Sequence, residues 1–129
     1  MRFFCDNNLS PKIAHALHCL AQPDHEVIHL RDRFPANVAD VDWLKALANE
    51  EGWAIISADT SIARNPHEAE AWRQSGHAIF FFKHALLHLP PWEQAARLCH
   101  IFPDLIKKAE RAWPGDSFQI PVRSKIEGP

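Results

Sequence analysis

The feature that most constrains the fold is a regular alternation of short apolar runs with longer segments of helical spacing. The apolar runs are Arg2–Cys5, 26–30, Trp53–Ser57 and 77–82. They are almost continuously apolar, which is typical of strands that are covered on both faces. Right-handed crossovers between such strands predict an α/β fold, a three-layer α/β/α sandwich around a parallel sheet. A further short strand at residues 118–122 would make this a four- to five-stranded sheet.

Capping residues predict where several helices begin. Ser10 precedes a proline, which is the pattern of an N-cap followed by proline at the first helical position. Asn65 also precedes a proline, and Glu68 stands where a capping box would let it reach back to the cap. Asp40 is expected to cap the helix that leads into the third strand. Pro103 is expected to break or kink the last long helix.

Length and composition favour one compact domain. The chain has 129 residues, of which 47% are hydrophobic and 23% charged, and its net charge is -2. We expect a domain over residues 1–112, a C-terminal tail over 113–129, and a cytoplasmic location, since no apolar stretch is long enough to span a membrane. The three cysteines lack C-x-x-C spacing, which argues against a structural zinc site or a disulfide framework.

Aspartates stand at one edge of the predicted sheet. Asp6 directly follows the first strand, Asp59 follows the third, and Asp40 begins a helix after the chain has left the second. Ligands of doubly wound sheets bind beyond the carboxyl ends of the strands. Clustered carboxylates repel one another, and a hard divalent cation such as Mg²⁺ or Mn²⁺ offsets that repulsion while keeping positions for phosphate oxygens. From spacing alone, these aspartates fit caps of turns and helices equally well.

Several motifs together resemble the PIN-like nucleases, in particular their compact VapC-toxin-like branch. The segments that resemble this family are RFFCDNNLS from Arg2, DVDWLKALA from Asp40, IISAD ending at Asp59, and RNP from Arg64. The similarity extends from about residue 2 to residue 112. It implies a PIN-like fold and a metal-dependent endoribonuclease, in which activated water hydrolyses RNA phosphodiesters. Asp6, Asp40 and Asp59 would be the catalytic and metal-binding residues.

The resemblance also raises the question of a further acid, because larger PIN domains carry another one. Asp42 is the first choice here, since it lies one turn inside the helix that Asp40 begins; the other candidates are Asp32, Glu68 and Glu70. Ser57 matches a small hydroxyl residue near the last aspartate that can orient a ligand or water. Arg31 and Arg64, together with Arg33, lie near the predicted active edge and could bind RNA phosphates.

A toxin-like nuclease implies partners as well as a substrate. We expect RNA as substrate, a small antitoxin protein that covers the acidic crevice or the apolar stretch between Trp92 and Trp113, and a homodimer as one assembly. The principal alternative is a catalytically decayed PIN-like protein that serves as a protein-interaction or RNA-binding module. A phospho-acceptor receiver domain fits less well, because it needs paired acids after the first strand and Asn8 stands two residues after Asp6.

Overall fold

The computed structural model describes residues 1–129 and contains one five-stranded parallel sheet. Its strands are β1 (Arg2–Cys5), β2 (Glu26–His29), β3 (Trp53–Ser57), β4 (Ala78–Phe82) and β5 (Ser117–Ile120), in the order β2-β1-β3-β4-β5. This confirms the predicted fold class. The strand order reverses between β1 and β3, and the crevice at such a switch point is where doubly wound sheets bind their ligands.

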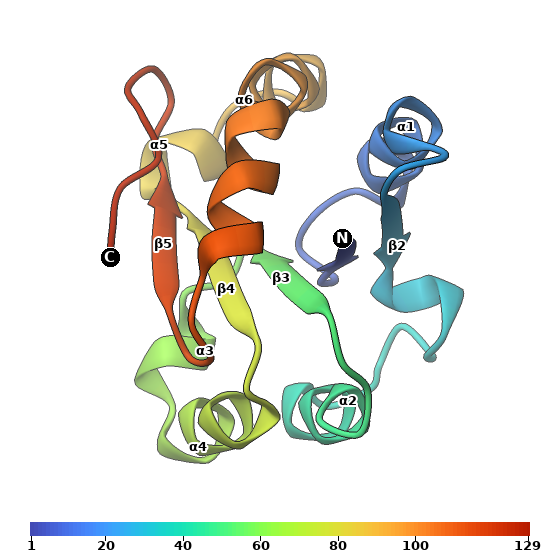
Figure 1. The fold of residues 1–129 in the computed structure, drawn as a ribbon, viewed down its shortest axis with the longest axis vertical. Coiled ribbons are helices and arrows are strands. Elements are labelled where there is room, and N and C mark those ends of the chain that lie inside the picture. The colour runs from blue at the N-terminus through green and yellow to red at the C-terminus, as the bar shows by residue number, and fades with distance from the viewer.

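Helices cover both faces of the sheet and give the three layers (Figure 1). Helices α1 (Pro11–Ala21) and α6 (Pro91–Arg111) lie on one face, and α2 (Asp40–Leu47) and α4 (Pro66–Ser75) on the other. The short elements η1 (Leu30–Asp32), α3 (Ser61–Arg64) and α5 (His84–Leu87) follow the carboxyl ends of β2, β3 and β4. None of the helices combines the length and apolar character needed to cross a membrane.

Successive residues of β1 pack into different layers, as the pleat of a strand requires. Phe3 contacts Phe102 of α6, with ring centroids 5.1 Å apart, whereas Phe4 stacks on Trp43 of α2 at 5.1 Å. The Trp43 side chain is completely buried. Because this aromatic contact fixes α2 against β1, it also fixes the start of α2, which is where Asp40 lies.

The predicted helix starts are confirmed at two of three positions. The Ser10 side chain accepts a hydrogen bond from the Lys12 amide, and Asn65 accepts from the amides of His67 and Glu68. The prediction that Asp40 is an N-cap was wrong. The cap residue is Ala39, which has no side-chain hydrogen bond, and Asp40 is the first residue of the helix proper.

The expectations for the C-terminal part can also be compared with the structure. Helix α6 includes Pro103 without a break, but Figure 1 shows its first part end-on and its last turns from the side, so the helix is kinked. Pro103 itself lies on the exposed face of the helix. The further strand expected at residues 118–122 is present as β5, which pairs with β4, and Phe118, Ile120 and Ile126 belong to the hydrophobic core.

Candidate active site

Asp6 lies at the switch point, directly after β1 and beside the end of β3. Strands β1 and β3 are hydrogen-bonded neighbours, with Cys5 opposite Ile56. The Asp6 side chain is only 3% exposed. Its Oδ1 accepts hydrogen bonds from the amides of Asn8 (3.2 Å) and Ala58 (3.3 Å), and its Oδ2 accepts from the Ser57 hydroxyl. Asp6 is therefore held rigidly by donors from both strand ends.

Burial nevertheless dominates the ionisation of Asp6. It raises the pKa of this carboxyl to about 7, although the hydrogen bonds from Ser57, Ala58 and Asn8 act in the opposite direction. The negative charge of Asp40 adds to the increase. Removal of a carboxylate from water favours its protonated form, and no lysine, arginine or histidine forms a salt bridge with Asp6. Asp6 is therefore a carboxyl that a bound cation would strongly favour in its charged form.

The Asp40 side chain contacts a residue one turn further along its own helix. Its Oδ1 accepts a hydrogen bond of 2.8 Å from the indole N–H of Trp43, which is buried in the core. This contact replaces the capping role that the sequence suggested for Asp40. It ties the carboxylate to a ring that packs on Phe4, close to the end of β1.

Glu68, one of the candidates for a further acid, lies near two of the three aspartates, Asp40 and Asp59. It lies in the first turn of α4, but it does not close a capping box, because the Asn65 amide already donates to the Ser61 carbonyl at 2.8 Å. Instead the Glu68 Oε2 is buried, and no N–H or hydroxyl group of the protein donates to it. Burial raises the pKa of Glu68. Asp40 raises it further, through its charge and through a hydrogen bond between the two carboxyls that needs a proton on one of them, and the charge of Asp59 acts in the same direction. Glu68 thus links the two aspartates across the face covered by α2 and α4.

Asp59 occupies the turn between β3 and α3. Its two carboxylate oxygens accept from the amide and the hydroxyl of Ser61, at 2.8 and 2.7 Å. Ser57 lies between Asp59 and Asp6: its hydroxyl donates to Asp6 and accepts from the Asp59 amide at 3.0 Å. The structural role predicted as an alternative for Asp59, the stabilisation of a turn, is therefore fulfilled. The Asp59 carboxylate also lies near Glu68, since its charge raises the pKa of Glu68.

We call Asp6, Asp40, Asp59 and Glu68 the acidic cluster. They come from four segments of the chain, and their carboxyls influence one another from Asp6 through Asp40 and Glu68 to Asp59. None of them forms a salt bridge with lysine, arginine or histidine, as the six ion pairs of the protein all lie elsewhere. No three acidic, histidine or cysteine side chains yet surround one point as metal ligands would.

The other acids suggested by the sequence lie outside this cluster. Asp42, the first choice for a further acid, is exposed on α2. Asp32 binds His15 and the His29 amide beyond β2, and Glu70 pairs with Arg73 on the outer face of α4. The sequence did offer one indication for Glu68, its place in the first turn of a helix that starts near Asp59. Nothing in the sequence showed that the capping position would already be occupied.

The two arginines expected to bind substrate flank the cluster. The Arg31 Nε donates to the Asn7 side chain at 2.9 Å, next to Asp6 along the chain. The Arg64 guanidinium donates to the Thr60 hydroxyl at 2.9 Å, next to Asp59. Both are exposed. Arg33, in contrast, points to the amino ends of the strands and pairs with Glu50 at 2.8 Å.

The parallel sheet, its switch point and the acids gathered there define an α/β domain with a candidate ligand site at the carboxyl edge of the sheet. The chain belongs to the family of PIN-like domains, whose family model matches residues 1–84. This span contains every member of the acidic cluster. No curated protein and no solved structure matches the chain. The narrower likeness to VapC-type toxins stays a prediction.

Proposed function

We propose that this protein is a divalent-metal-dependent endoribonuclease and that the acidic cluster holds its metal. The observation that carries this proposal is the buried Glu68 Oε2, which receives no hydrogen bond from an N–H or hydroxyl group and whose only close polar neighbours are further carboxyls, Asp40 first among them. A buried carboxylate oxygen without a partner is costly unless a proton or a cation satisfies it. Such an oxygen does not stabilise the fold, so we interpret it as a ligand for a cation.

The donor set fits Mg²⁺ or Mn²⁺. The cluster consists only of carboxylates, which are the oxygen ligands that these hard cations prefer, and it contains no histidine. Cys5 is adjacent to Asp6 in sequence, but its thiol is fully buried and burial raises its pKa, which disfavours the thiolate a softer metal would need. Since no three carboxyls yet surround one point, loading requires some of these side chains to reorient.

The residues of the chain would then have distinct roles. Asp6 is the rigid ligand, because backbone amides and Ser57 fix it, whereas Glu68 and Asp40 have fewer restraints and can adjust. Arg31 and Arg64 lie on either side to bind phosphates. When bound, a divalent ion supplies an activated water and stabilises the leaving oxygen of the phosphodiester.

The test is a cleavage assay on mixed RNAs with Mn²⁺, comparing Asp6→Asn and Glu68→Gln with wild type. Each removes a charge while nearly keeping shape, and we expect cleavage to fall by more than about 100-fold, since even outer partners of metal ligands typically contribute 10- to 100-fold. The matched controls are Asp42→Asn on α2 and Glu70→Gln on α4, which change exposed acids of the same helices. Equal loss in the controls, or normal cleavage by Glu68→Gln, would refute the assignment.

We further propose that the nuclease acts as the toxin of a toxin–antitoxin pair in the cytoplasm. The motivation is the sequence resemblance together with Trp92 at the start of α6, which is 88% exposed and suits a protein partner. Expression of the wild type alone should arrest growth, and the Asp6→Asn variant should be tolerated at the same level. Equal tolerance of both forms would speak for the alternative, a decayed module, provided the purified wild type also fails to cleave RNA.

A further inference from the structure

Positive side chains are concentrated along α6 and the loop that follows β5. Two hollows, of about 360 and 440 Å³, adjoin there, since Asp104 and Lys108 line both. The positive side chains that line them form what we call the basic strip: Arg97, Lys107, Lys108, Arg111, Arg123 and Lys125. Only Asp104 and Asp116 contribute acidic side chains to this lining. In a chain with a net charge of -2, the strip is a marked local excess of positive charge.

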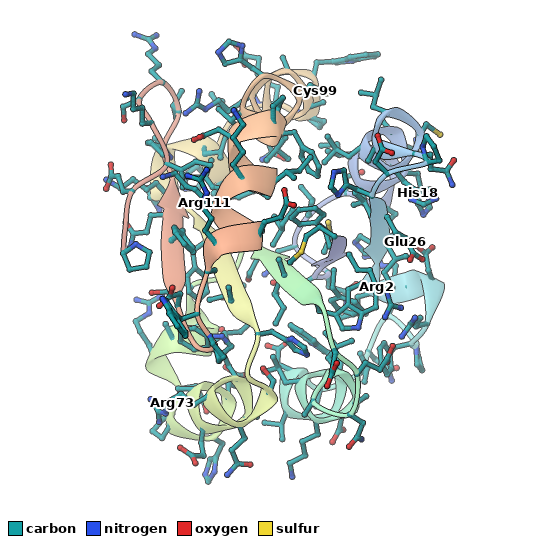
Figure 2. The ribbon with its side chains drawn as sticks, viewed as in Figure 1. Arg2, His18, Glu26, Arg73, Cys99 and Arg111 are labelled. Atoms are coloured by element: carbon teal, nitrogen blue, oxygen red, sulfur yellow. The ribbon has the colours of Figure 1, made fainter.

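Most of these cations have no partner within the protein. Arg97 is the exception, because its guanidinium donates to the carbonyls of Pro121 and Ser124 and so holds the loop after β5 against α6. The other lysines and arginines of the strip form no salt bridge, whereas Arg2, Arg33, Arg73 and Lys83 each have one. Figure 2 shows Arg111 near the end of α6, on the side of β5. These side chains are therefore free to bind an anionic ligand.

A strongly exposed aromatic side chain belongs to the same surface. Trp113 follows the end of α6 and is 77% exposed. It lines the hollow of about 360 Å³ together with Lys108 and Arg111. Its backbone amide donates to the Asp116 carboxylate at 2.8 Å, which fixes the main chain at this point. An exposed indole among cations suits the stacking of an unpaired base, while the cations suit the phosphates on either side of it.

We propose that the basic strip binds the backbone of single-stranded RNA, with Trp113 stacking on one base, and that it supplies affinity which the acidic cluster lacks. This inference rests on the proposed function, because the strip would guide a substrate to that cluster. Carboxylates repel RNA, so an enzyme with such a centre needs a separate source of attraction. An unpaired strand is favoured over a duplex, since only an unstacked base can cover the indole face.

The strip runs along α6 from the carboxyl edge of the sheet, where the proposed catalytic centre lies, to the opposite edge. Trp113 lies at that opposite edge, where it lines a further hollow with Met1 and Trp53 at the amino ends of the strands, so a bound strand would extend along α6 away from the centre.

Residues 121–126 follow the carboxyl end of β5, and that strand is parallel to β4, which is parallel to β3. Arg123 and Lys125 therefore lie beyond the same edge of the sheet as Ser57 and Asp59. Two strand spacings separate β5 from β3, or about 10 Å. In Figure 1 this loop turns back beside β5 at the outer side of the sheet, and Arg97 of α6 donates to its carbonyls.

The experiment measures binding of a labelled single-stranded RNA by fluorescence anisotropy, with EDTA present and in the Asp6→Asn background, so that no cleavage occurs. The test variant combines Lys108→Gln, Arg111→Gln and Lys125→Gln. The matched control combines Lys12→Gln with Lys45→Gln, which are exposed, unpaired cations on α1 and α2. We expect the test variant to lose more than about tenfold in affinity and its salt slope to fall by about 2, from roughly 0.7 for each phosphate contact. The control should match the background.

A second arm addresses Trp113. Trp113→Ala should weaken binding of the single strand about tenfold, and Trp113→Phe should restore most of it. Unchanged affinity and salt slope in the triple variant, equal binding of a duplex, or no RNA binding by the background protein would each overturn the inference. The last result would instead favour a protein partner for the strip.

The two proposals can fail separately. Binding that depends on the strip, without any cleavage by wild type, would refute only the nuclease proposal. Cleavage that depends on Asp6, with an unchanged KM in the triple variant, would refute only the proposal that the strip binds RNA.

Discussion

Charged side chains are paired with opposite charges at one end of the central strands β1 and β3, but not at the other. At the amino end, Arg2 pairs with Glu26 at 3.4 Å and with Glu50 at 3.5 Å, and Arg33 pairs with Glu50 at 2.8 Å. The Arg2 guanidinium also lies 3.9 Å from the centroid of the Trp53 ring. Figure 2 shows Arg2 and Glu26 near each other on β1 and β2. Every charge named here has an opposite charge beside it.

At the carboxyl end of the same strands, the acids face hydrogen-bond donors or one another. The pKa of Asp6 is raised to about 7, chiefly by burial, and that of Glu68 is raised as well, again chiefly by burial. At the amino end, the hydrogen bond from Arg33 lowers the pKa of Glu50. Groups whose ionisation opposes folding are retained where function needs them. The functional site is therefore expected at the carboxyl end of these strands.

The largest expected effect concerns Asp6 and pH. Its pKa is about 7 in the folded protein and about 4 when unfolded. Below about pH 4 the Asp6 carboxyl is protonated in both the folded and the unfolded protein. Between about pH 4 and pH 7 it is protonated only in the folded protein, so the free energy of unfolding falls as the pH rises through this range. At about 1.4 kcal/mol per pH unit, wild type should lose roughly 4 kcal/mol relative to Asp6→Asn over this range. Urea unfolding in EDTA at pH 4.5 to 7.5 measures the difference.

The control for this experiment is Asp42→Asn, which removes an exposed carboxylate from α2. Its stability should differ little from that of wild type, because this exposed side chain forms no salt bridge. A difference between Asp6→Asn and wild type that does not change with pH would mean that Asp6 is ionised in the folded protein at pH 5. The contrast between the two ends of the sheet would then lose its main support.

The next effect concerns loading with metal. Mn²⁺ at 100 times its Kd should stabilise wild type by about 2.7 kcal/mol at pH 7.5, because it binds the folded state alone. For a chain of this size that corresponds to roughly 10 °C in Tm. Glu68→Gln should lose most of this increase, since it removes the buried oxygen that has no other partner. Thermal melts with and without Mn²⁺ measure it.

A control variant on the same helix and a change of pH sharpen this result. Glu70→Gln lies on the same helix as Glu68 but on its exposed side, and should respond to Mn²⁺ as wild type does. Stabilisation should also fade below about pH 6, because protons compete with the metal for Asp6. An equal Mn²⁺ response in wild type and Glu68→Gln would show that the ion binds outside the acidic cluster.

Most of the fold could be predicted from the sequence because its elements are defined by local patterns. Strands β1 and β3 are apolar runs that end at an aspartate, and their predicted bounds are those observed. Helix α4 begins where Asn65 predicted it and ends before Gly76, whose φ of 74° suits a left-handed C-cap. β5 was harder to place, since a short edge strand at the end of a chain carries little pattern of its own.

The candidate site was predictable only in part, because it depends on which of several local partners each side chain finds. Asp6 and Asp59 follow from strand ends. Asp40 was expected as a cap, but the cap is Ala39, and the Asp40 carboxylate accepts from Trp43 instead. Glu68 was weighed below Asp42, and only the tertiary structure shows that the Asn65 amide is already occupied and that α4 carries Glu68 towards Asp40.

The smallest expected effect concerns the amino end. Glu50→Gln removes the partner of Arg33 and Arg2 at a partly exposed site, and should cost about 0.5–1 kcal/mol of stability at neutral pH. Here the sign is opposite to that of Asp6. Because the Arg33 hydrogen bond lowers the pKa of Glu50 in the folded protein, its contribution is present above the unfolded pKa and is lost as pH falls through the folded one. Glu51→Gln, an exposed neighbour, is the control and should change little. Urea unfolding at pH 3 and pH 7 decides the matter: an advantage of wild type over Glu50→Gln that grows towards acid pH would contradict the assignment of Glu50 as a stabilising partner.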